Sequence, residues 1–280
     1  MVGCADLKYF NLTHSDILDQ EFHILISKFP LLEKLVVQRC YDIKRVVLSS
    51  NQLKELRVIH CFCLTAIDVI NVPSLLTFYY QFGCRPAHSI NSPCSCQWKI
   101  GSSFDPGPNM VLNGLDRIKK IMEMPYDIEE LRMSIYIWHQ DPFTLVKFKK
   151  RSPSPPREVG NLTIDVRVLP PSNYAALLDC LLWICYPRIF SIKIFHCKQS
   201  TEFIMWLYEK MTKRDAKCCN RHGIKCWQHY LKDFKIESFI PFKDPKPLHI
   251  DNLMAGLPKL PQGTIRFCLD WCFSEYIDGA

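Results

Sequence analysis

The chain has 280 residues, of which 48% are hydrophobic and 12% are aromatic. This is enough apolar material for a large core, and it excludes a chain that is disordered throughout. Lysine and arginine exceed aspartate and glutamate by 35 to 28, a formal charge of +7, and only residues 147–151 form a tight basic run, so nucleic-acid binding is weakly supported. No stretch approaches the roughly 20 apolar residues that span a bilayer, and residues 1–13 lack the apolar core of a signal peptide.

The cysteine content indicates a reducing compartment. Fifteen cysteines cannot all pair, and their spacings do not form the compact framework of a small disulfide-rich domain. Because we also find no signal peptide, we expect the protein in the cytosol or the nucleus, without a membrane segment.

A repeated pattern of apolar residues is the strongest feature of the sequence. Residues Leu32–Cys40 read L-x-x-L-x-V-x-x-C, and the same pattern returns 21 positions later at Leu53–Cys61. The second leucine and the valine alternate on a short strand and point inward, and one such unit must stack on others to bury its apolar face. The pattern is that of a leucine-rich repeat (LRR). It predicts an α/β solenoid with a curved parallel sheet on the concave side and helices and loops on the convex side.

Further copies of the strand pattern, and three or four helices, follow along the chain. The other expected strands contain the apolar pairs Phe10/Leu12, Phe78/Tyr80, Leu131/Met133, Leu162/Ile164, Ile192/Ile194, Phe234/Ile236 and Phe267/Leu269. Helical spacing of apolar residues predicts helices over Asp19–Lys28, Tyr174–Cys185 and Thr201–Arg214, and a short helix near Ile250–Gly256.

Two segments interrupt the repeats of what we expect to be a single LRR domain over residues 1–280. Residues 81–108 are rich in Gly, Pro, Ser and Cys, which predicts an irregular excursion with only short structure. Residues 147–157 read KFKKRSPSPPR, and their prolines exclude a regular helix, so we expect an exposed linker. Its two Ser-Pro steps beside basic residues leave phosphorylation or nuclear targeting open.

The residues that flank the inward pairs should face outward on the concave sheet and form a binding surface. Those that we expect to bind are Lys34, Val36, Gln38, Glu55, Arg57, Ile59, Thr77, Tyr79, Gln81, Arg132, Lys193 and Lys235. The weaker strands add Glu130, Ser134, Asn161, Thr163, Asp165, Ser191, Phe195, Asp233 and Glu237. Mixed charge with arginine and tyrosine suits a protein surface better than a phosphate backbone. A solvated sheet face without a ligand is the alternative at each position.

Zinc binding is the sharpest chemical alternative, and catalysis has less support. Cys226-x-x-His229 is a plausible half-site, but adjacent Cys218 and Cys219 do not form the usual chelating turn. Together these four residues would suit a zinc-supported nucleic-acid-binding protein. No phosphate loop, G-x-S-x-G elbow or H-E-x-x-H helix is present, so we expect no enzyme activity and no cofactor.

Cysteines and histidines at matching repeat positions suggest structural roles. Cys40, Cys61 and Cys197 occupy one repeat position, where a small buried thiol can face the turn after the strand. His60 and His196 each precede one of these cysteines, which suggests a role in the turn rather than in chemistry.

Ordered phrases over well over half of the chain resemble the plant F-box/LRR family, including its members with an FBD tail. The N-terminal phrases are FPLLEKLVVQRC, SSNQLKELRVIHC and INVPSLLTFYY, and the later ones are DCLLWICYPRIFSIKIF, EFIMWLYEK and CCNRHGIKCWQHYLKDFKIESF. The resemblance implies the substrate-recognition part of an SCF ubiquitin ligase. We find no F-box module of the kind that docks the Skp adaptor and no room for an FBD, so we expect an unidentified protein partner on the concave face and no association with Skp.

Overall fold

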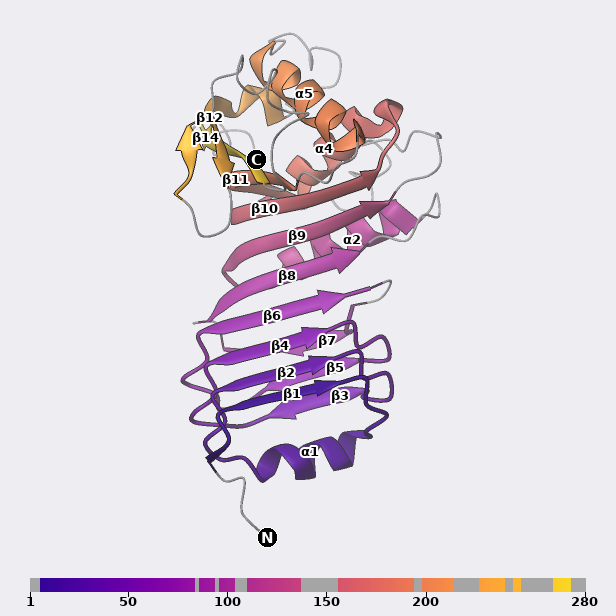
Figure 1. The fold of residues 1–280 in the computed structure, drawn as a ribbon, viewed down its shortest axis with the longest axis vertical. Helices are drawn as coiled ribbons and strands as arrows, with labels where there is room; N and C mark the ends of the chain where they lie inside the picture. Colours follow the sequence, from indigo (N-terminus) through magenta and orange to yellow (C-terminus); the bar gives the residue numbers. More distant parts are fainter. Residues whose placement is uncertain are drawn as a thin grey trace. The chain divides into compact units, whose positions relative to one another are not determined.

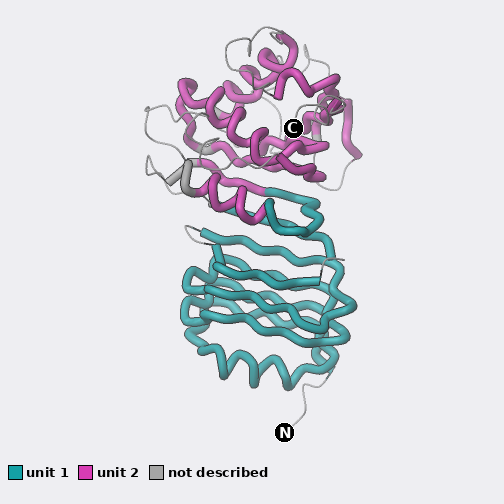
Figure 2. The backbone as a smooth tube through the Cα atoms, turned by 180° about the vertical axis from the view of Figure 1, so that it is seen from behind, with its two compact units in different colours: residues 1–103, 123–131 teal, residues 104–122, 132–280 magenta. Residues whose placement is uncertain are grey.

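The chain divides into two compact units. The structure is a computed structural model that describes residues 6–83, 86–93, 96–103, 110–136, 156–193, 198–213, 227–239, 244–247 and 264–272. Unit 1 comprises residues 1–103 and 123–131, and unit 2 comprises residues 104–122 and 132–280 (Figure 2). The single domain expected over residues 1–280 stays a prediction, and the two units are described separately.

Unit 1 is built on five parallel strands in the order β1-β2-β4-β6-β8 (Figure 1). Their bounds are β1 Tyr9–Thr13, β2 Lys34–Gln38, β4 Glu55–Ile59, β6 Thr77–Phe82 and β8 Gln97–Ser103. The register pairs Leu35 with Leu56 and Val37 with Val58, so the repeat unit of the sequence is also the unit of strand pairing. The parallel strands expected from the apolar pattern are confirmed for β1, β2, β4 and β6.

A second, shorter sheet forms the other layer of unit 1. Its parallel strands are β3 Arg45–Leu48, β5 Ala66–Val69 and β7 Ser89–Asn91. Helix α1 (Asp19–Ser27) lies at the end of this layer beside β3 (Figure 1). The Asp19 carboxylate accepts hydrogen bonds from the backbone N–H groups of Lys44 at 2.8 Å and Arg45 at 3.2 Å. The first residue of the helix therefore accepts hydrogen bonds from two backbone N–H groups at the edge of the smaller sheet, where no neighbouring strand among the described residues is present to accept them.

The core of unit 1 is built from the inward side chains of both sheets. Leu35, Leu56 and Phe78 follow one another across the larger sheet with 0% exposure, and Val46 and Ile67 are equally buried in the smaller one. Strands were not expected in this layer. The prediction of helices and loops there is wrong, although Asp19–Lys28 is confirmed as a helix.

The predicted excursion over residues 81–108 is wrong in its central part. Strand β8 pairs in parallel with β6 along its length, and β7 joins the second sheet. Trp98 and Ile100 of β8 are completely buried and occupy the place that the repeat pattern gives to its apolar pair. Stacking on the preceding strand thus extends the repeat architecture into a segment rich in turn-forming residues.

Unit 2 combines strands and helices. Its elements are α2 Met110–Met122, β10 Arg157–Val168, α4 Tyr174–Ile184, β11 Cys185–Lys193, α5 Lys198–Thr212, β12 Leu231–Phe239, β13 Lys246–Pro247 and β14 Thr264–Trp271, and β9 Ile128–Tyr136 has residues in both units. The helices expected from the pattern are confirmed as α4 and α5, whereas α2 was not predicted. The helix expected near Ile250–Gly256 and residues 147–155 of the expected linker lie outside the described residues, and Arg157 begins β10.

The strand order of unit 2 departs from that of stacked repeats. Strands β10 and β11 are parallel, as expected. Strand β14 lies between β11 and β12 and is antiparallel to both, so the prediction of parallel repeat strands at Phe234/Ile236 and Phe267/Leu269 is wrong. The apolar alternation identifies the strands, but its period of two is the same in parallel and antiparallel strands.

A buried lysine links two helices of unit 2. Lys119 of α2 is 1% exposed, and its ammonium donates a hydrogen bond at 3.3 Å to the carbonyl oxygen of Trp183 near the end of α4.

The first residue of β11, Cys185, is fully buried, and burial raises the pKa of its thiol to about 12. This thiol is therefore neutral at physiological pH and packs as an apolar group. Among the described residues, no helix is both long and apolar enough to cross a membrane.

Candidate functional site

The outward residues of the unit 1 sheet form three rows across its five strands. We call this the outward face, meaning the side of β1-β2-β4-β6-β8 that is turned away from β3, β5 and β7. The strand register defines the rows as Tyr9-Lys34-Glu55-Thr77-Gln97, Asn11-Val36-Arg57-Tyr79-Lys99 and Thr13-Gln38-Ile59-Gln81-Gly101. Neighbours in a row are close enough for their side chains to interact because parallel strands lie about 4.8 Å apart.

Two cations on this face share one carboxylate, and each also lies over a tyrosine ring. The Lys34 ammonium lies 2.9 Å from a Glu55 carboxylate oxygen, and Arg57 forms an ion pair with the same carboxylate. The Lys34 Nζ atom is 5.7 Å from the centre of the Tyr9 ring, and the Arg57 guanidinium is 5.9 Å from that of Tyr79. These contacts hold long side chains in defined positions before any ligand arrives.

A glycine on β8 makes room for the end of the Tyr79 side chain. The Tyr79 hydroxyl donates a hydrogen bond to the Gln81 side-chain oxygen at 2.9 Å. A Cβ atom on Gly101 would lie 2.9 Å from Gln81 Cγ and 3.1 Å from Tyr79 Oη. Any side chain at this position would therefore displace the pair, and the missing Cβ lets Tyr79 and Gln81 lie against β8.

The charge state of Glu55 depends on its two cationic neighbours. Partial burial raises the pKa of its carboxyl, but hydrogen bonds from Lys34 and Arg57, together with their positive charges, outweigh that effect and bring the pKa below its ordinary value of 4.5. The Glu55 carboxyl is therefore ionised near neutral pH.

We expect the ionised Glu55 to stabilise unit 1 at pH values above 4.5 and this contribution to disappear as the pH falls through the lowered pKa. A carbon-13 titration of the Glu55 carboxyl would measure that pKa directly. The variant Lys34→Gln should raise it towards the ordinary value, since one hydrogen bond and one positive charge are removed. A carboxyl in the unmodified protein that titrates at or above 4.5 would contradict the assignment.

The structure brings nine of the predicted binding residues together on the outward face, but they differ in accessibility. Arg57 is exposed, whereas Lys34, Gln38, Glu55, Ile59, Thr77, Tyr79 and Gln81 are half-buried. Val36 lies in the central row but is only 7% exposed, so it is covered by its neighbours and offers little surface. Whether any of these residues binds a ligand stays a prediction.

The predicted binding residues of unit 2 differ among themselves in accessibility and in the direction of their strands. Arg132 and Lys193 are half-buried, and Lys235 is exposed on β12, which runs antiparallel to β14. Thr163, Asp165 and Ser191 were expected to face outward but are buried at 4%, 5% and 1% exposure. Phe195 lies outside the described residues.

Six residues of the outward face were not among the predicted binding residues: Tyr9, Asn11, Thr13, Gln97, Lys99 and Gly101. Tyr9 and Lys99 lie on β1 and β8, and Lys99 forms an ion pair at 3.3 Å with Glu129. Tyr9 could have been found, because it has the same place relative to Phe10/Leu12 as Lys34 has relative to Leu35/Val37. Gly101 has no comparable signal, since its role depends on the side chains of the neighbouring strand.

The repeated cysteines of unit 1 have the structural role that was expected. The Cys40 thiol faces the carbonyl oxygens of Leu12 at 3.7 Å and Gln38 at 3.5 Å, and the Cys61 thiol faces the equivalent pair one strand further on. Both residues are buried, and a hydrogen bond with Cys40 together with burial raises the pKa of the Cys61 thiol. Cys197 lies outside the described residues.

The metal alternative remains without a structural test. Cys218, Cys219 and Cys226 lie outside the described residues, and only His229 of this group is described, in a short helical turn at Trp227–His229. In the part of the chain that the structure describes, no group of three or more His, Cys, Asp or Glu side chains is placed to hold a metal ion.

Comparison with known proteins supports the repeat interpretation of the N-terminal half. Residues 1–136 match the family model described as At1g61320/AtMIF1, LRR domain, which represents a plant leucine-rich-repeat family. The matched range contains every residue of unit 1. In the comparisons with curated proteins and with solved structures, nothing matched. The match and the parallel sheet agree on an LRR-like α/β fold for this region.

Proposed function

We propose that the chain is a protein-binding LRR module whose outward face in unit 1 contacts the partner. The observation that carries this proposal is the cluster in which Lys34 and Arg57 share Glu55 and lie over Tyr9 and Tyr79. Arginine and tyrosine are frequent energetic anchors of protein interfaces. Their side chains are already positioned by ion pairs and ring contacts, so binding would cost less conformational entropy than it does for free side chains.

We further infer that the repeats form a solenoid and that the module resembles the substrate-recognition part of an SCF ubiquitin ligase. The LRR match over residues 1–136 supports the repeat architecture, and the ubiquitin-ligase role is proposed only from the F-box/LRR-like phrases of the sequence. In this proposal the module works in the cytosol or nucleus, selects its partner by binding, and performs no catalytic step and needs no cofactor. Direct assay with the purified Skp adaptor should give no association, and a tight complex would contradict that expectation.

The proposal predicts that the double variant Arg57→Ala, Tyr79→Ala loses its partner. Proteins captured from extract by the full chain would be identified, and the reproducible partner would be purified and its Kd measured by calorimetry. We expect the double variant to bind at least about ten-fold more weakly, because truncation of an interface anchor costs more than about 1 kcal/mol and two anchors are removed.

The matched control for this experiment is Arg45→Ala. Arg45 is an exposed arginine in an ion pair with Asp68 on the smaller sheet of unit 1, so its loss removes the same charge without altering the outward face. Equal binding by the double variant and the unmodified chain would show that the chosen rows are wrong. A steep loss of binding between low and physiological salt would instead favour a nucleic acid as the ligand.

A further inference from the structure

The turns that follow β1, β2 and β4 carry side chains where glycine is energetically favoured. His14, Arg39 and His60 each have φ of 53°, the left-handed region. Their backbone N–H groups donate to Gln38, Ile59 and Gln81 at 3.0, 2.9 and 2.8 Å, so each turn continues the ladder to the next strand. A residue with a Cβ atom is disfavoured in this conformation by about 1 kcal/mol relative to glycine. Three successive side chains are nevertheless present, and the turn role expected for His60 is confirmed.

These three side chains lie near one another at this edge of the sheet. The Arg39 guanidinium donates from Nη1 to the His14 ring nitrogen Nε2 at 3.3 Å. Among the described residues no carboxylate lies within 4.0 Å of Arg39, although Asp16 and Asp42 are exposed at the same edge. His60 is half-buried, and burial and then the charge of Arg39 lower the pKa of its ring. The His60 ring is therefore favoured in its neutral form, and the positive charge of the group is that of Arg39.

Two exposed aromatic rings lie directly beside this group. Tyr41 and Phe62 stack with their ring centres 5.6 Å apart and their planes at 5°, yet 40% and 50% of their surfaces remain exposed. The ring centre of His60 is 6.0 Å from that of Phe62, which joins the aromatic pair to the group. Phe62 also lies against Gly83, where the ring occupies the space that a Cβ atom would need.

We propose that this turn edge, defined as His14, Arg39, Tyr41, His60 and Phe62, binds a phosphorylated tyrosine side chain. An arginine fork matches the oxygens of a phosphate monoester, and the exposed His14, whose Nε2 accepts from Arg39, can donate to a further oxygen from its other ring nitrogen. A carboxylate has only two oxygens, which a single guanidinium already satisfies. The tyrosine ring would pack beside Tyr41 and Phe62, since aromatic groups gain by offset or edge contacts.

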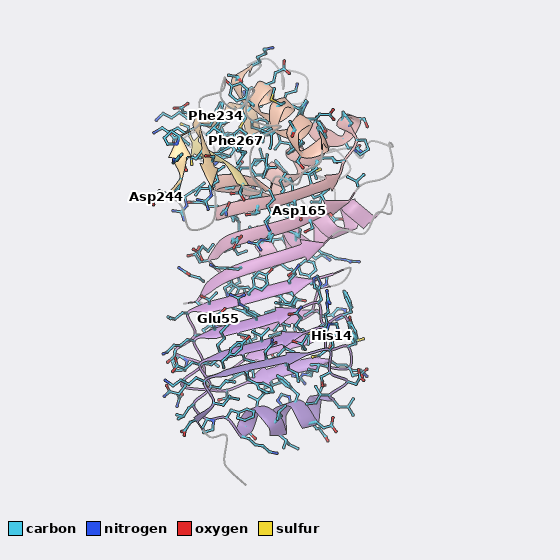
Figure 3. All side chains as sticks on the ribbon, in the orientation of Figure 1. His14, Glu55, Asp165, Phe234, Asp244 and Phe267 are labelled. Atoms are coloured by element: carbon cyan, nitrogen blue, oxygen red, sulfur yellow. The ribbon has the colours of Figure 1, made fainter. Side chains whose placement is uncertain are left out.

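The turn edge is separate from the Lys34 and Glu55 cluster. Figure 3 shows His14 and Glu55 at opposite ends of the strands of unit 1. This agrees with the sequence, since Glu55 begins β4 and His14 follows the last residue of β1. The proposal therefore does not depend on the function proposed for the outward face.

Titration of the full chain with O-phosphotyrosine, followed by calorimetry, tests the proposal. We expect saturable binding that is at least about ten-fold tighter than that of inorganic phosphate or of tyrosine, because each of these probes offers only half of the contacts. Arg39→Gln should weaken O-phosphotyrosine binding at least about ten-fold, whereas Arg45→Gln, which changes an exposed arginine on the other sheet, should leave it unchanged. The double variant Arg57→Ala, Tyr79→Ala should also bind O-phosphotyrosine normally.

Arg39→Gly separates ligand binding from folding. Glycine relieves the left-handed conformation at this turn, so this variant should unfold at the same or a higher temperature than the unmodified chain while it loses O-phosphotyrosine. The proposal would be overturned by absence of O-phosphotyrosine binding, by equal affinity for inorganic phosphate, or by unchanged binding in Arg39→Gly.

Discussion

Replacement of Leu56 by alanine should lower the free energy of unfolding by about 2–5 kcal/mol, the range observed when a buried leucine is truncated. Leu56 is 0% exposed and lies at the centre of the unit 1 sheet, where its strand neighbours are Leu35 and Phe78. The replacement leaves a cavity that adjacent repeats cannot easily fill, because each strand is held in register by hydrogen bonds to the strands on both sides.

Leu76→Ala is the matched control for Leu56→Ala. Leu76 immediately precedes β6 but is 64% exposed, so the same chemical change should alter stability by less than about 0.5 kcal/mol. Urea unfolding, together with hydrogen exchange of the β2, β4 and β6 amides, would show whether the loss occurs in unit 1. A loss below about 1 kcal/mol for Leu56→Ala, or equal losses for both variants, would contradict the inward assignment of the repeat leucines.

The strands of the larger sheet could be predicted because their pattern and their pairing have the same repeat. Leu35 and Leu56 are 21 positions apart in the sequence and are direct partners in the sheet. The pattern specifies both which side chains point inward and which residues pair, so few other arrangements of these parallel strands are compatible with it. The outward rows on β2, β4 and β6 followed from the same alternation.

The smaller sheet was missed although its signal has the same spacing. Val46 and Leu48 of β3 recur as Ile67 and Val69 of β5, again 21 positions later. The repeat pattern L-x-x-L-x-V-x-x-C describes only one strand per repeat, and the second alternation is only four residues long, which is also typical of a connection. The inward side chains Val46, Leu48, Ile67 and Val69 are at most 3% exposed, and this is why these segments carry branched apolar residues.

The errors in unit 2 have a different origin. Alternation in Phe267/Leu269 identified a strand, but only pairing with distant residues places β14 antiparallel between β11 and β12. Helix α2 was hidden by the Gly- and Pro-rich residues before it, although the buried Leu115, Ile118 and Met122 follow helical spacing. Local periodicity reports which face is buried, whereas strand direction is a property of the tertiary structure.

The turn edge illustrates what sequence reasoning can and cannot predict about a site. Matching positions in the repeat identified His60 as a turn residue, and the left-handed φ of 53° confirms that role. The contact between Arg39 and His14 could not be anticipated, because these residues are 25 positions apart and the first repeat is longer than those that follow. Only the strand register brings their side chains together.

Truncation of Trp98 should have the other large effect, a loss of about 3–5 kcal/mol for Trp98→Ala. Trp98 of β8 is 0% exposed and stacks on Tyr126 with 4.1 Å between ring centres, and it meets Phe78 edge-on at 4.6 Å. It therefore joins β6, β8 and the residues before β9 within unit 1. An irregular excursion would tolerate the same change, so the size of the loss measures how far β8 belongs to the repeat core.

Trp98→Phe is the informative companion to Trp98→Ala. It retains an aromatic ring between Phe78 and Tyr126 but removes the indole N–H, which is buried without a hydrogen-bond partner among the described residues. Phenylalanine has a smaller ring and loses part of the stacking energy, but removal of the unsatisfied buried N–H group offsets part of that loss of stability. Trp98→Phe should therefore be clearly more stable than Trp98→Ala in urea unfolding. Equal losses for the two variants would indicate that the indole N–H has a partner or that ring stacking contributes little. A loss below about 1 kcal/mol for Trp98→Ala would show that residues 97–103 do not belong to the core of unit 1.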